Sequence, residues 1–366
     1  MNLKEQNILL FTRTMKLGGT ENVVLMLCEI LKPHVNKIVV CSCGGVNVGK
    51  LDNMGIKHYQ IPDIESKSPQ TLFATIKELK NIVKKEDITV IHTHHRMAAF
   101  YVALTKLYKK CAFINTSHNT FTNKRALTRF AYKHADLVAC GEAVKRNLVE
   151  FFSLSENKVS VVHNAVMPFD GNLIPVPELE KLKNEGKSLI GNIGRLSKQK
   201  GMDYFIKAIP SIIKEYPNAY FVIVGNGEEE NNLKRLTEEL NVKDHVWFMG
   251  YRSDVQNVIS QLDLIVLSSL WEGLPLLPIE AFSVGKTVVA TAVDGTPEIV
   301  KDGANGLLVE PGNSVQLANK IITMLKDKEL KERMEKKALE TYLTEFSFEK
   351  YSARIIDYFS YVINRN

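Results

Sequence analysis

The strongest constraint in this sequence is the alternation of short apolar runs with helical patterns, which occurs twice along 366 residues. In the first half the runs are NILLF (7–11), KIVVCS (37–42), ITVIHTH (88–94), AFINTSH (112–118) and DLVACG (136–141). Continuous runs rich in β-branched residues are typical of parallel strands that helices cover on both faces. They predict a doubly wound α/β domain.

A proline-rich stretch at 167–187 interrupts this rhythm, and we expect it to be an exposed connection between two domains. The runs then restart as SLIGNIG (188–194), AYFVIVG (219–225), HVWFMG (245–250), LDLIVLSS (262–269), TVVATAV (287–293) and NGLLVEP (305–311). We predict Rossmann-like domains over 1–166 and 188–345. The amphipathic segment 346–366, with a candidate N-cap at Ser347, is expected to form a helix that packs back towards the first domain.

Composition excludes several classes of protein. An apolar fraction of 45% and a charged fraction of 24% are ordinary for a globular chain and exclude disorder. No window reaches the roughly 18 apolar residues of a membrane-spanning helix, and the start has no signal-peptide pattern, so we expect a cytosolic protein. The five cysteines form no C-x-x-C pair, which predicts reduced thiols. A net charge of +6 permits attraction to phosphate or to an anionic membrane without identifying either, and no nucleic acid is expected.

Two facing domains of this kind form a cleft at the carboxyl ends of their strands, where we expect the active site. The first loop carries Gly18 and Gly19 before a predicted helix, whose N-terminus can bind a phosphate; a tight turn explains these glycines equally well. Arg195 and Lys200 follow another strand and could neutralise a diphosphate, although exposed loop cations often serve only solubility.

Four histidines lie at the ends of strands in the first half: His92, His94, His95 and His118. His92 and His94 share a face, as an H-x-H metal pair would, but no third ligand of clear spacing completes a metal site. The favoured interpretation is that they line the cleft or cap the strand. His118 could hydrogen-bond a substrate or be an ordinary loop residue.

The stretch WEGLPLLPIEA (271–281) carries two glutamates. We expect Glu272 in the loop after the strand and Glu280 in the first turns of the next helix, where prolines are tolerated. The helix rise of about 1.5 Å per residue separates them along the axis. Such a pair can hold two parts of one elongated ligand, whereas glycoside hydrolysis needs two carboxylates that flank one bond.

In this order, the motifs resemble those of the retaining glycosyltransferases of family 4, which have the GT-B fold. WEGLPLLPIEA resembles the family's E-x7-E region, GRLSKQKG its diphosphate-binding stretch, GGTEN its glycine loop and TSH its first-domain histidine. The resemblance covers essentially the whole chain. It departs from many relatives at Pro275 and Leu276, where they have a second glycine.

The resemblance implies a role for each matching residue. The residues implied to be catalytic are Glu272, His118, Arg195 and Lys200. Arg195 and Lys200 would bind the donor diphosphate in place of a metal ion, Glu272 the donor sugar, and Glu280 the ribose hydroxyls. The other implied donor-binding residues are Gly18, Gly19, Tyr251, Arg252, Gly273, Leu274, Pro275, Leu276 and Leu277. The acceptor side would carry His94 and His95.

The implied function is retaining, metal-independent transfer of a hexose-type sugar. The donor would be a nucleotide-sugar, UDP favoured over GDP, and the acceptor a glycan or lipid-linked precursor in polysaccharide or glycoconjugate synthesis, with no cofactor. The alternatives are a GT-B-type nucleotide-sugar epimerase and a non-catalytic sugar- or nucleotide-binding protein. The basic stretch 123–134 favours a solvated helix face over peripheral contact with the inner face of the plasma membrane.

Overall fold

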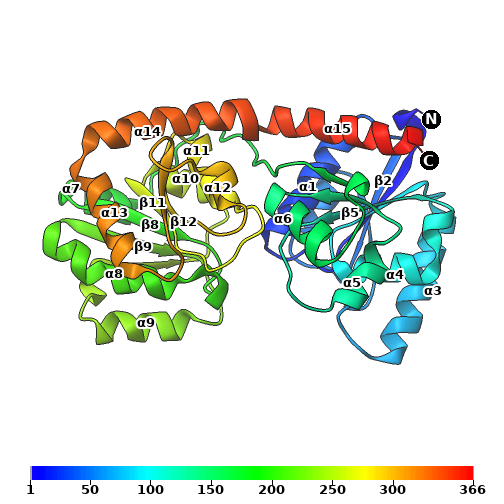
Figure 1. Ribbon diagram of the computed structural model, residues 1–366, viewed down its shortest axis with the longest axis horizontal. Coiled ribbons are helices and arrows are strands. Elements are labelled where there is room, and N and C mark those ends of the chain that lie inside the picture. Colours follow the sequence, from blue (N-terminus) through cyan, green and yellow to red (C-terminus); the bar gives the residue numbers. More distant parts are fainter. Residues whose placement is uncertain (1, 366) are drawn as a thin grey trace. The chain divides into compact units, whose positions relative to one another are not determined.

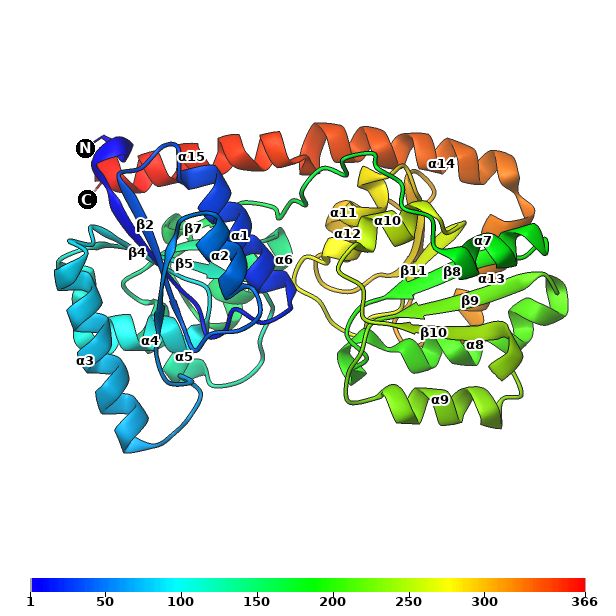
Figure 2. The same cartoon turned by 180° about the vertical axis from the view of Figure 1, so that it is seen from behind.

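The computed structural model describes residues 2–365, which form two compact units. Unit 1 comprises residues 2–164 and 351–365, and unit 2 comprises residues 165–350. Each unit is a parallel sheet with helices on both faces (Figure 1, Figure 2). The expectation of two doubly wound, Rossmann-like domains is confirmed.

Unit 1 contains a seven-stranded sheet in the order β3-β2-β1-β4-β5-β6-β7. Its strands are β1 (Asn7–Phe11), β2 (Lys37–Ser42), β3 (Lys57–Gln60), β4 (Val90–Thr93), β5 (Ala112–Ser117), β6 (Asp136–Ala139) and β7 (Val159–Val161). All five residues of the central strand β1 are buried, as its apolar run predicts. The edge strands β3 and β7 were not expected, because both are short and β3 consists of the polar sequence KHYQ.

The helices of unit 1 lie on the two faces of this sheet. They are α1 (Gly19–Leu31), α2 (Val48–Asn53), α3 (Pro69–Lys85), α4 (Arg96–Thr105), α5 (Arg125–Tyr132), α6 (Glu142–Arg146) and α15 (Phe348–Arg365), whose first three residues belong to unit 2. Helix α4 packs against α3 and α5 on one face, and α1 lies on the opposite face (Figure 1, Figure 2). The connections on either side of β1 thus cover opposite faces.

Unit 2 contains a six-stranded sheet in the order β10-β9-β8-β11-β12-β13. Its strands are β8 (Ser188–Ile193), β9 (Ala219–Val224), β10 (Val246–Gly250), β11 (Leu264–Leu267), β12 (Val288–Thr291) and β13 (Gly306–Val309). Its helices are α7 (Pro177–Asn184), α8 (Met202–Glu215), α9 (Glu230–Glu239), α10 (Val255–Ser260), α11 (Leu276–Ser283), α12 (Thr296–Ile299), α13 (Ser314–Lys326) and α14 (Lys328–Thr341). Helix α8 packs against α9 and α13 on one face, whereas α11 packs against α10 and α14 on the other (Figure 1).

The last helix, α15, is amphipathic as predicted. The Ser347 hydroxyl accepts a hydrogen bond from the backbone N–H of Lys350 at 3.4 Å, which is the expected N-cap contact. Its buried side chains are Tyr351, Ile355, Tyr358, Phe359, Val362 and Ile363. Phe359 lies edge-on against the ring of His92 in β4, with centroids 5.5 Å apart.

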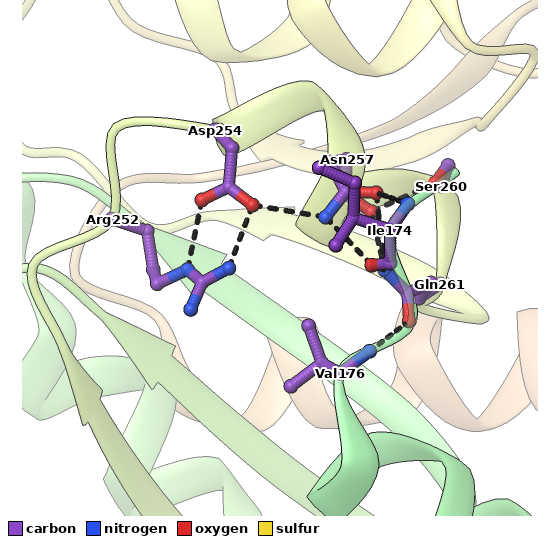
Figure 3. Close-up of polar contacts among 7 residues, drawn as sticks. All are labelled: Ile174, Val176, Arg252, Asp254, Asn257, Ser260 and Gln261. Atoms are coloured by element: carbon purple, nitrogen blue, oxygen red, sulfur yellow. Dashed lines mark hydrogen bonds and ion pairs between the residues drawn. The ribbon is translucent and has the colours of Figure 1, made fainter. Parts of the chain in front are cut away.

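The segment 167–187, expected as an exposed connection between domains, is largely exposed but lies within unit 2. Part of it forms α7, in which Leu179 is fully buried. Before α7, the side chain of Asn257 in α10 bonds both the backbone N–H of Ile174 (2.9 Å) and its carbonyl oxygen (3.0 Å), as Figure 3 shows. Gln261 accepts from the N–H of Val176 at 2.9 Å. Two buried amide side chains therefore satisfy the backbone groups that the prolines leave without a regular partner.

Replacing Asn257 should release this segment from unit 2. In Asn257→Ala, backbone groups of Ile174 lose their partners, so we expect the free energy of unfolding to fall by about 2–3 kcal/mol. Amide hydrogen exchange, followed by mass spectrometry, should accelerate in the peptide around 172–178. Ser260→Ala is the control, because its hydroxyl bonds only within α10, to the Asn257 carbonyl (2.8 Å). Unchanged exchange around 172–178 in Asn257→Ala would contradict this anchoring.

Candidate functional site

In both sheets, several of the candidate residues follow the strands at which the winding changes direction. These strands are β1 and β4 in unit 1, and β8 and β11 in unit 2. At such a point the two following loops turn to opposite faces, which leaves room for a ligand at the carboxyl edge. The loop after β8 carries Arg195 and Lys200, and the loop after β11 carries Glu272.

In unit 2, Lys200 and Glu272 form an ion pair. The Lys200 Nζ lies 2.6 Å from Glu272 Oε1, and the Ser269 hydroxyl donates to the same oxygen at 2.6 Å. Glu272 is only 5% exposed, so its carboxylate is shielded from water, whereas the Lys200 side chain is 22% exposed. The sequence assigned the two side chains to different parts of a ligand; in the structure they bind each other.

Two further residues hold the Glu272 loop in place. The Asp294 carboxylate accepts a hydrogen bond from the backbone N–H of Glu272 at 2.7 Å. Gly201 has a φ of +54°, and a Cβ there would collide with the Ser268 carbonyl oxygen, so only glycine suits this turn. Sequence reasoning missed Ser269 and Asp294, because a serine and an aspartate in loops carry no signal until the fold brings them to Glu272.

Arg195 differs from Lys200 in its environment. Its side chain is exposed, and no hydrogen bond or ion pair engages it within the part of the chain that the structure describes. In the same unit, helix α11 begins after Pro275 without a side-chain cap, so the backbone N–H groups of Leu276 and Leu277 point out of its first turn. A free guanidinium and an uncapped helix N-terminus are both suited to bind an anion.

Glu280 lies in α11 and is half-buried. Burial raises the pKa of its carboxyl to about 7, against the opposing attraction of Lys200. A carboxyl group with this pKa changes charge near neutral pH. It can accept hydrogen bonds from a diol most strongly when it is ionised.

The loop after β10 contains Tyr251 and Arg252, the residues expected beside a base. Tyr251 is 45% exposed. The Arg252 guanidinium makes a bidentate bridge to Asp254, with distances of 2.8 and 2.6 Å (Figure 3). Asp254 in turn accepts from Asn257 at 2.9 Å, so this loop is tied to the anchor of Ile174. A base would meet the Tyr251 ring and the backbone here, because Asp254 occupies two of the Arg252 nitrogen atoms.

In unit 1, His92, His94 and His118 form a continuous row at the ends of β4 and β5. The rings of His92 and His94 lie 4.2 Å apart, which confirms that they share a face. His94 Nδ1 lies 3.1 Å from His118 Nε2, and His92 Nε2 lies 2.7 Å from the Thr116 hydroxyl. Burial lowers the pKa of His92 to about 3 and that of His118 to about 4, and it holds the pKa of His94 well below its usual value. All three rings are therefore neutral at pH 7.

His94 and His95, the residues expected on the acceptor side, differ in their exposure and contacts. His94 is only 3% exposed and lies behind His118, which is half-buried. His95 caps the start of α4, since its Nδ1 accepts from the N–H of Met97 at 3.2 Å, and its Nε2 lies 3.6 Å from Glu65. Among residues 2–365, no group of three or more His, Cys, Asp or Glu side chains is arranged to hold a metal ion.

The glycine loop of unit 1 leads directly into α1. Gly18 is the N-cap residue and Gly19 is the first residue of the helix, with no side-chain cap. The Glu21 carboxylate accepts a hydrogen bond from the Thr14 hydroxyl across this loop. The backbone N–H groups at the start of α1 lie at the same edge of the sheet as His118.

Comparisons with known proteins give a consistent result. The model of the group 1 glycosyl transferases matches residues 178–341, and that of glycosyltransferase family 4 matches residues 17–168. The UDP-Gal:α-D-GlcNAc-diphosphoundecaprenol α-1,3-galactosyltransferase of Escherichia coli is 27% identical over 95% of each chain. An uncharacterized glycosyltransferase of Haemophilus influenzae is 28% identical over 88% of this chain and 90% of its own.

Solved structures share the fold. A glycosyltransferase of Rickettsia africae superposes with a TM-score of 0.83 and 23% identity, over 99% of this chain and 100% of its own. HepE of Anabaena, solved in complex with UDP, also has a TM-score of 0.83, with 22% identity over 97% of this chain and 100% of its own. Two Rossmann-like units of the GT-B type are thus common to all three chains.

Glu280 should lower the stability of unit 2 when it is ionised. The pKa of Glu280 in the folded protein, about 7, lies above the ordinary value of 4.5. The resulting loss of folding free energy is therefore absent below pH 4.5 and complete above pH 7. We expect Glu280→Gln to raise the free energy of unfolding by about 2–3 kcal/mol at pH 8.5 and by much less at pH 5. Urea denaturation at the two pH values measures this. Glu228→Gln, at an exposed position, is the control; an equal gain at both pH values would contradict the assignment.

Proposed function

Because this chain belongs to the group 1 glycosyltransferases, we propose that it transfers a hexose-type sugar from a UDP-sugar to a glycan or lipid-linked acceptor. The observation that carries the proposal is the arrangement of charges at the carboxyl edge of unit 2. A free cation, Arg195, and a paired one, Lys200, lie in the loop after β8, and two buried or half-buried glutamates follow β11. This set provides positive charge for a diphosphate and acceptors for hydroxyl groups.

In this proposal the donor opens the Lys200–Glu272 pair. The diphosphate competes with the carboxylate for the ammonium group, and sugar hydroxyls replace the ammonium as donors to Glu272. Because each buried charge receives a new partner as it loses the old one, neither is left unpaired. Ser269 and Asp294 keep the loop in position during this exchange. Glu280 then accepts from the ribose hydroxyls, and Tyr251 and the backbone of Arg252 border the base.

The preference for UDP over GDP rests on two relatives. HepE of Anabaena binds UDP and UDP-glucose, and the Escherichia coli relative takes UDP-Gal. Retention of configuration and a site without a metal ion belong to the same proposal and rest on the family 4 resemblance. Arg195, Lys200 and the N–H groups of α11 would then stabilise the charge that develops on the departing diphosphate.

Incubation with radiolabelled donors and acceptors tests the function. The donors are UDP- and GDP-linked hexoses and N-acetylhexosamines, and the acceptors are polyprenyl-diphosphate-linked sugars. We expect transfer from a UDP-sugar, a product with the donor's anomeric configuration by proton NMR, and activity that EDTA does not remove. Transfer from GDP-sugars alone would contradict the donor assignment. Conversion of the donor to an isomer without acceptor would identify an epimerase instead.

Arg195→Ala should remove most of the turnover while leaving the fold intact. Its exposed guanidinium has no partner within the described residues, so its loss affects only the bound diphosphate. We expect kcat to fall by about 10²–10³-fold, the usual effect of losing one group that stabilises developing charge. Lys198→Ala is the matched control, because Lys198 is exposed in the same loop. Equal rates in the two variants would rule out this role for Arg195.

We also propose that unit 1 contacts an anionic membrane through α5 while the protein works in the cytosol. Among residues 2–365, no helix has both the length and the apolar character needed to cross a bilayer. Helix α5 presents Arg129 beside Phe130, which is 46% exposed, and Lys133 follows the end of the helix. A cavity of about 360 Å³ opens there, lined by Arg129, Phe130, Tyr132, Lys133, Leu137, Ser153, Leu154, Ser155 and Lys158.

Positive charge is dense around this cavity. Besides burial, the nearby ammonium groups of Lys133, Lys158 and Lys109 lower the pKa of His134. An exposed aromatic ring among several cations suits the interface of an anionic bilayer, where the ring enters the headgroup region and the cations remain at its surface. The source of a lipid-linked acceptor would then lie beside unit 1.

Vesicle sedimentation tests the membrane contact. The double variant Arg129→Glu, Lys133→Glu should bind phosphatidylglycerol-containing vesicles at least about tenfold more weakly than the unmodified chain, since each cation contributes about 1 kcal/mol near such a surface. Added salt should weaken binding of the unmodified chain. Arg333→Glu, Lys336→Glu reverses two exposed charges on α14 and is the control. Equal binding by the two double variants, or no binding by the unmodified chain, would contradict the membrane contact and indicate that α5 faces only solvent.

A further inference from the structure

We propose that His94 is a positioning residue that holds His118 with its proton on Nδ1, so that His118 acts as a hydrogen-bond donor towards the substrate. The inference rests on the proposed function only in so far as His118 meets a substrate. It gives a role to His94, whose side chain is too deeply buried to touch a ligand. The supporting observation is the row of contacting side chains that ends at His118.

The contact between the two rings is direct and enclosed. His94 Nδ1 lies 3.1 Å from His118 Nε2, and the two rings stack with an interplanar angle of 24°. His94 is 3% exposed and His92 is fully buried, and their rings are 4.2 Å apart. Behind them, Phe359 of α15 covers His92. The ring of His94 therefore has little freedom to turn.

The nitrogen atoms that lack a hydrogen-bond partner indicate which of the two rings carries the proton between them. In a neutral imidazole one nitrogen is an N–H donor and the other is a bare acceptor. His94 Nε2 is buried without a hydrogen-bond partner. A buried N–H without a partner is the rarer and costlier case, so we assign the bare nitrogen to Nε2 and the proton to Nδ1. His94 then donates to His118 Nε2.

The same reasoning fits the next ring in the row. His92 Nδ1 is also buried without a partner, while His92 Nε2 lies 2.7 Å from the Thr116 hydroxyl. With Nδ1 bare, Nε2–H donates to that hydroxyl. Both buried histidines thus keep their unmatched nitrogen unprotonated, and each directs its one proton to a polar neighbour.

The tautomer of His94 determines the tautomer of His118, at the more exposed end of the row. Because His118 Nε2 accepts from His94, neutral His118 carries its proton on Nδ1, which has no hydrogen-bond partner among residues 2–365. This N–H can donate to a hydroxyl oxygen of the donor sugar or of the acceptor. With its other nitrogen occupied by His94, the ring has no lone pair with which to remove a proton from the acceptor.

The tautomer can be read directly in the unmodified, 15N-labelled full-length chain at pH 7. Long-range proton–nitrogen spectra resolve N–H and bare nitrogen atoms of each of the nine histidines, and His118→Gln identifies the His118 signals. We expect His118 with Nδ1 protonated and His94 with Nε2 bare. His118 protonated on Nε2 overturns the proposal. This measurement needs no substrate, so its outcome is independent of whether transfer activity is found.

Two variants then separate positioning from general support of the fold. Asn places an amide N–H near the position of His Nδ1, whereas Leu fills the space without a donor. We expect His94→Leu to lower kcat about 10–100-fold with the Kd for UDP changed by less than about twofold, and His94→Asn to stay within about threefold of the unmodified enzyme. Retention of the His118 tautomer in His94→Leu would contradict the proposal.

A double variant completes the test. If His94 acts only through His118, adding His94→Leu to His118→Ala should change kcat by less than about twofold, because the group it orients is already gone. A full further loss in the double variant would show that His94 acts through the fold, and would overturn the positioning role.

Discussion

The structure depends on one constraint: in a parallel sheet, every strand needs a crossover, and the crossovers cover both faces. Buried on both sides, strands such as β1 and β8 consist of apolar or small residues along most of their length. Polar chemistry is therefore confined to the loops at the strand ends. The change of winding direction at β1/β4 and at β8/β11 separates neighbouring loops at one edge of each sheet. The histidines of unit 1 and the charged residues of unit 2 both lie at such edges.

The central strands could be predicted because burial on both faces leaves an unmistakable apolar run. The edge strands could not, since β3 is four residues long with two exposed ends, and β7 has only three residues. Helix α7 was missed for another reason. Three prolines and a charged tail indicate a loop, yet Pro177 stands in the first turn, where a missing N–H costs nothing, and Leu179 fills the core.

For the site, the sequence predicted which residues lie at the edges of the sheets, but not which of these residues bind each other. The positions of Arg195, Lys200, Glu272 and Glu280 follow from the strand boundaries and the order of the motifs. The bond between Lys200 and Glu272 joins residues 72 positions apart, and only the pairing of β8 with β11 brings them together. Likewise, alternation along β4 indicates that His92 and His94 share a face, whereas the contact of His94 with His118, which follows β5, is not revealed by any local pattern.

The two units differ in how they accommodate the buried ionisable groups of the site. In unit 2, Glu272 is paired with Lys200 and accepts a hydrogen bond from Ser269, whereas burial raises the pKa of Glu280. Unit 1 removes the charge altogether, because burial keeps the row of three histidines neutral. A paired charge can be exchanged for a charged ligand at little cost, whereas a neutral ring can only donate or accept a hydrogen bond. In the proposed function, the diphosphate would therefore bind in unit 2, and uncharged hydroxyl groups would meet the histidines of unit 1.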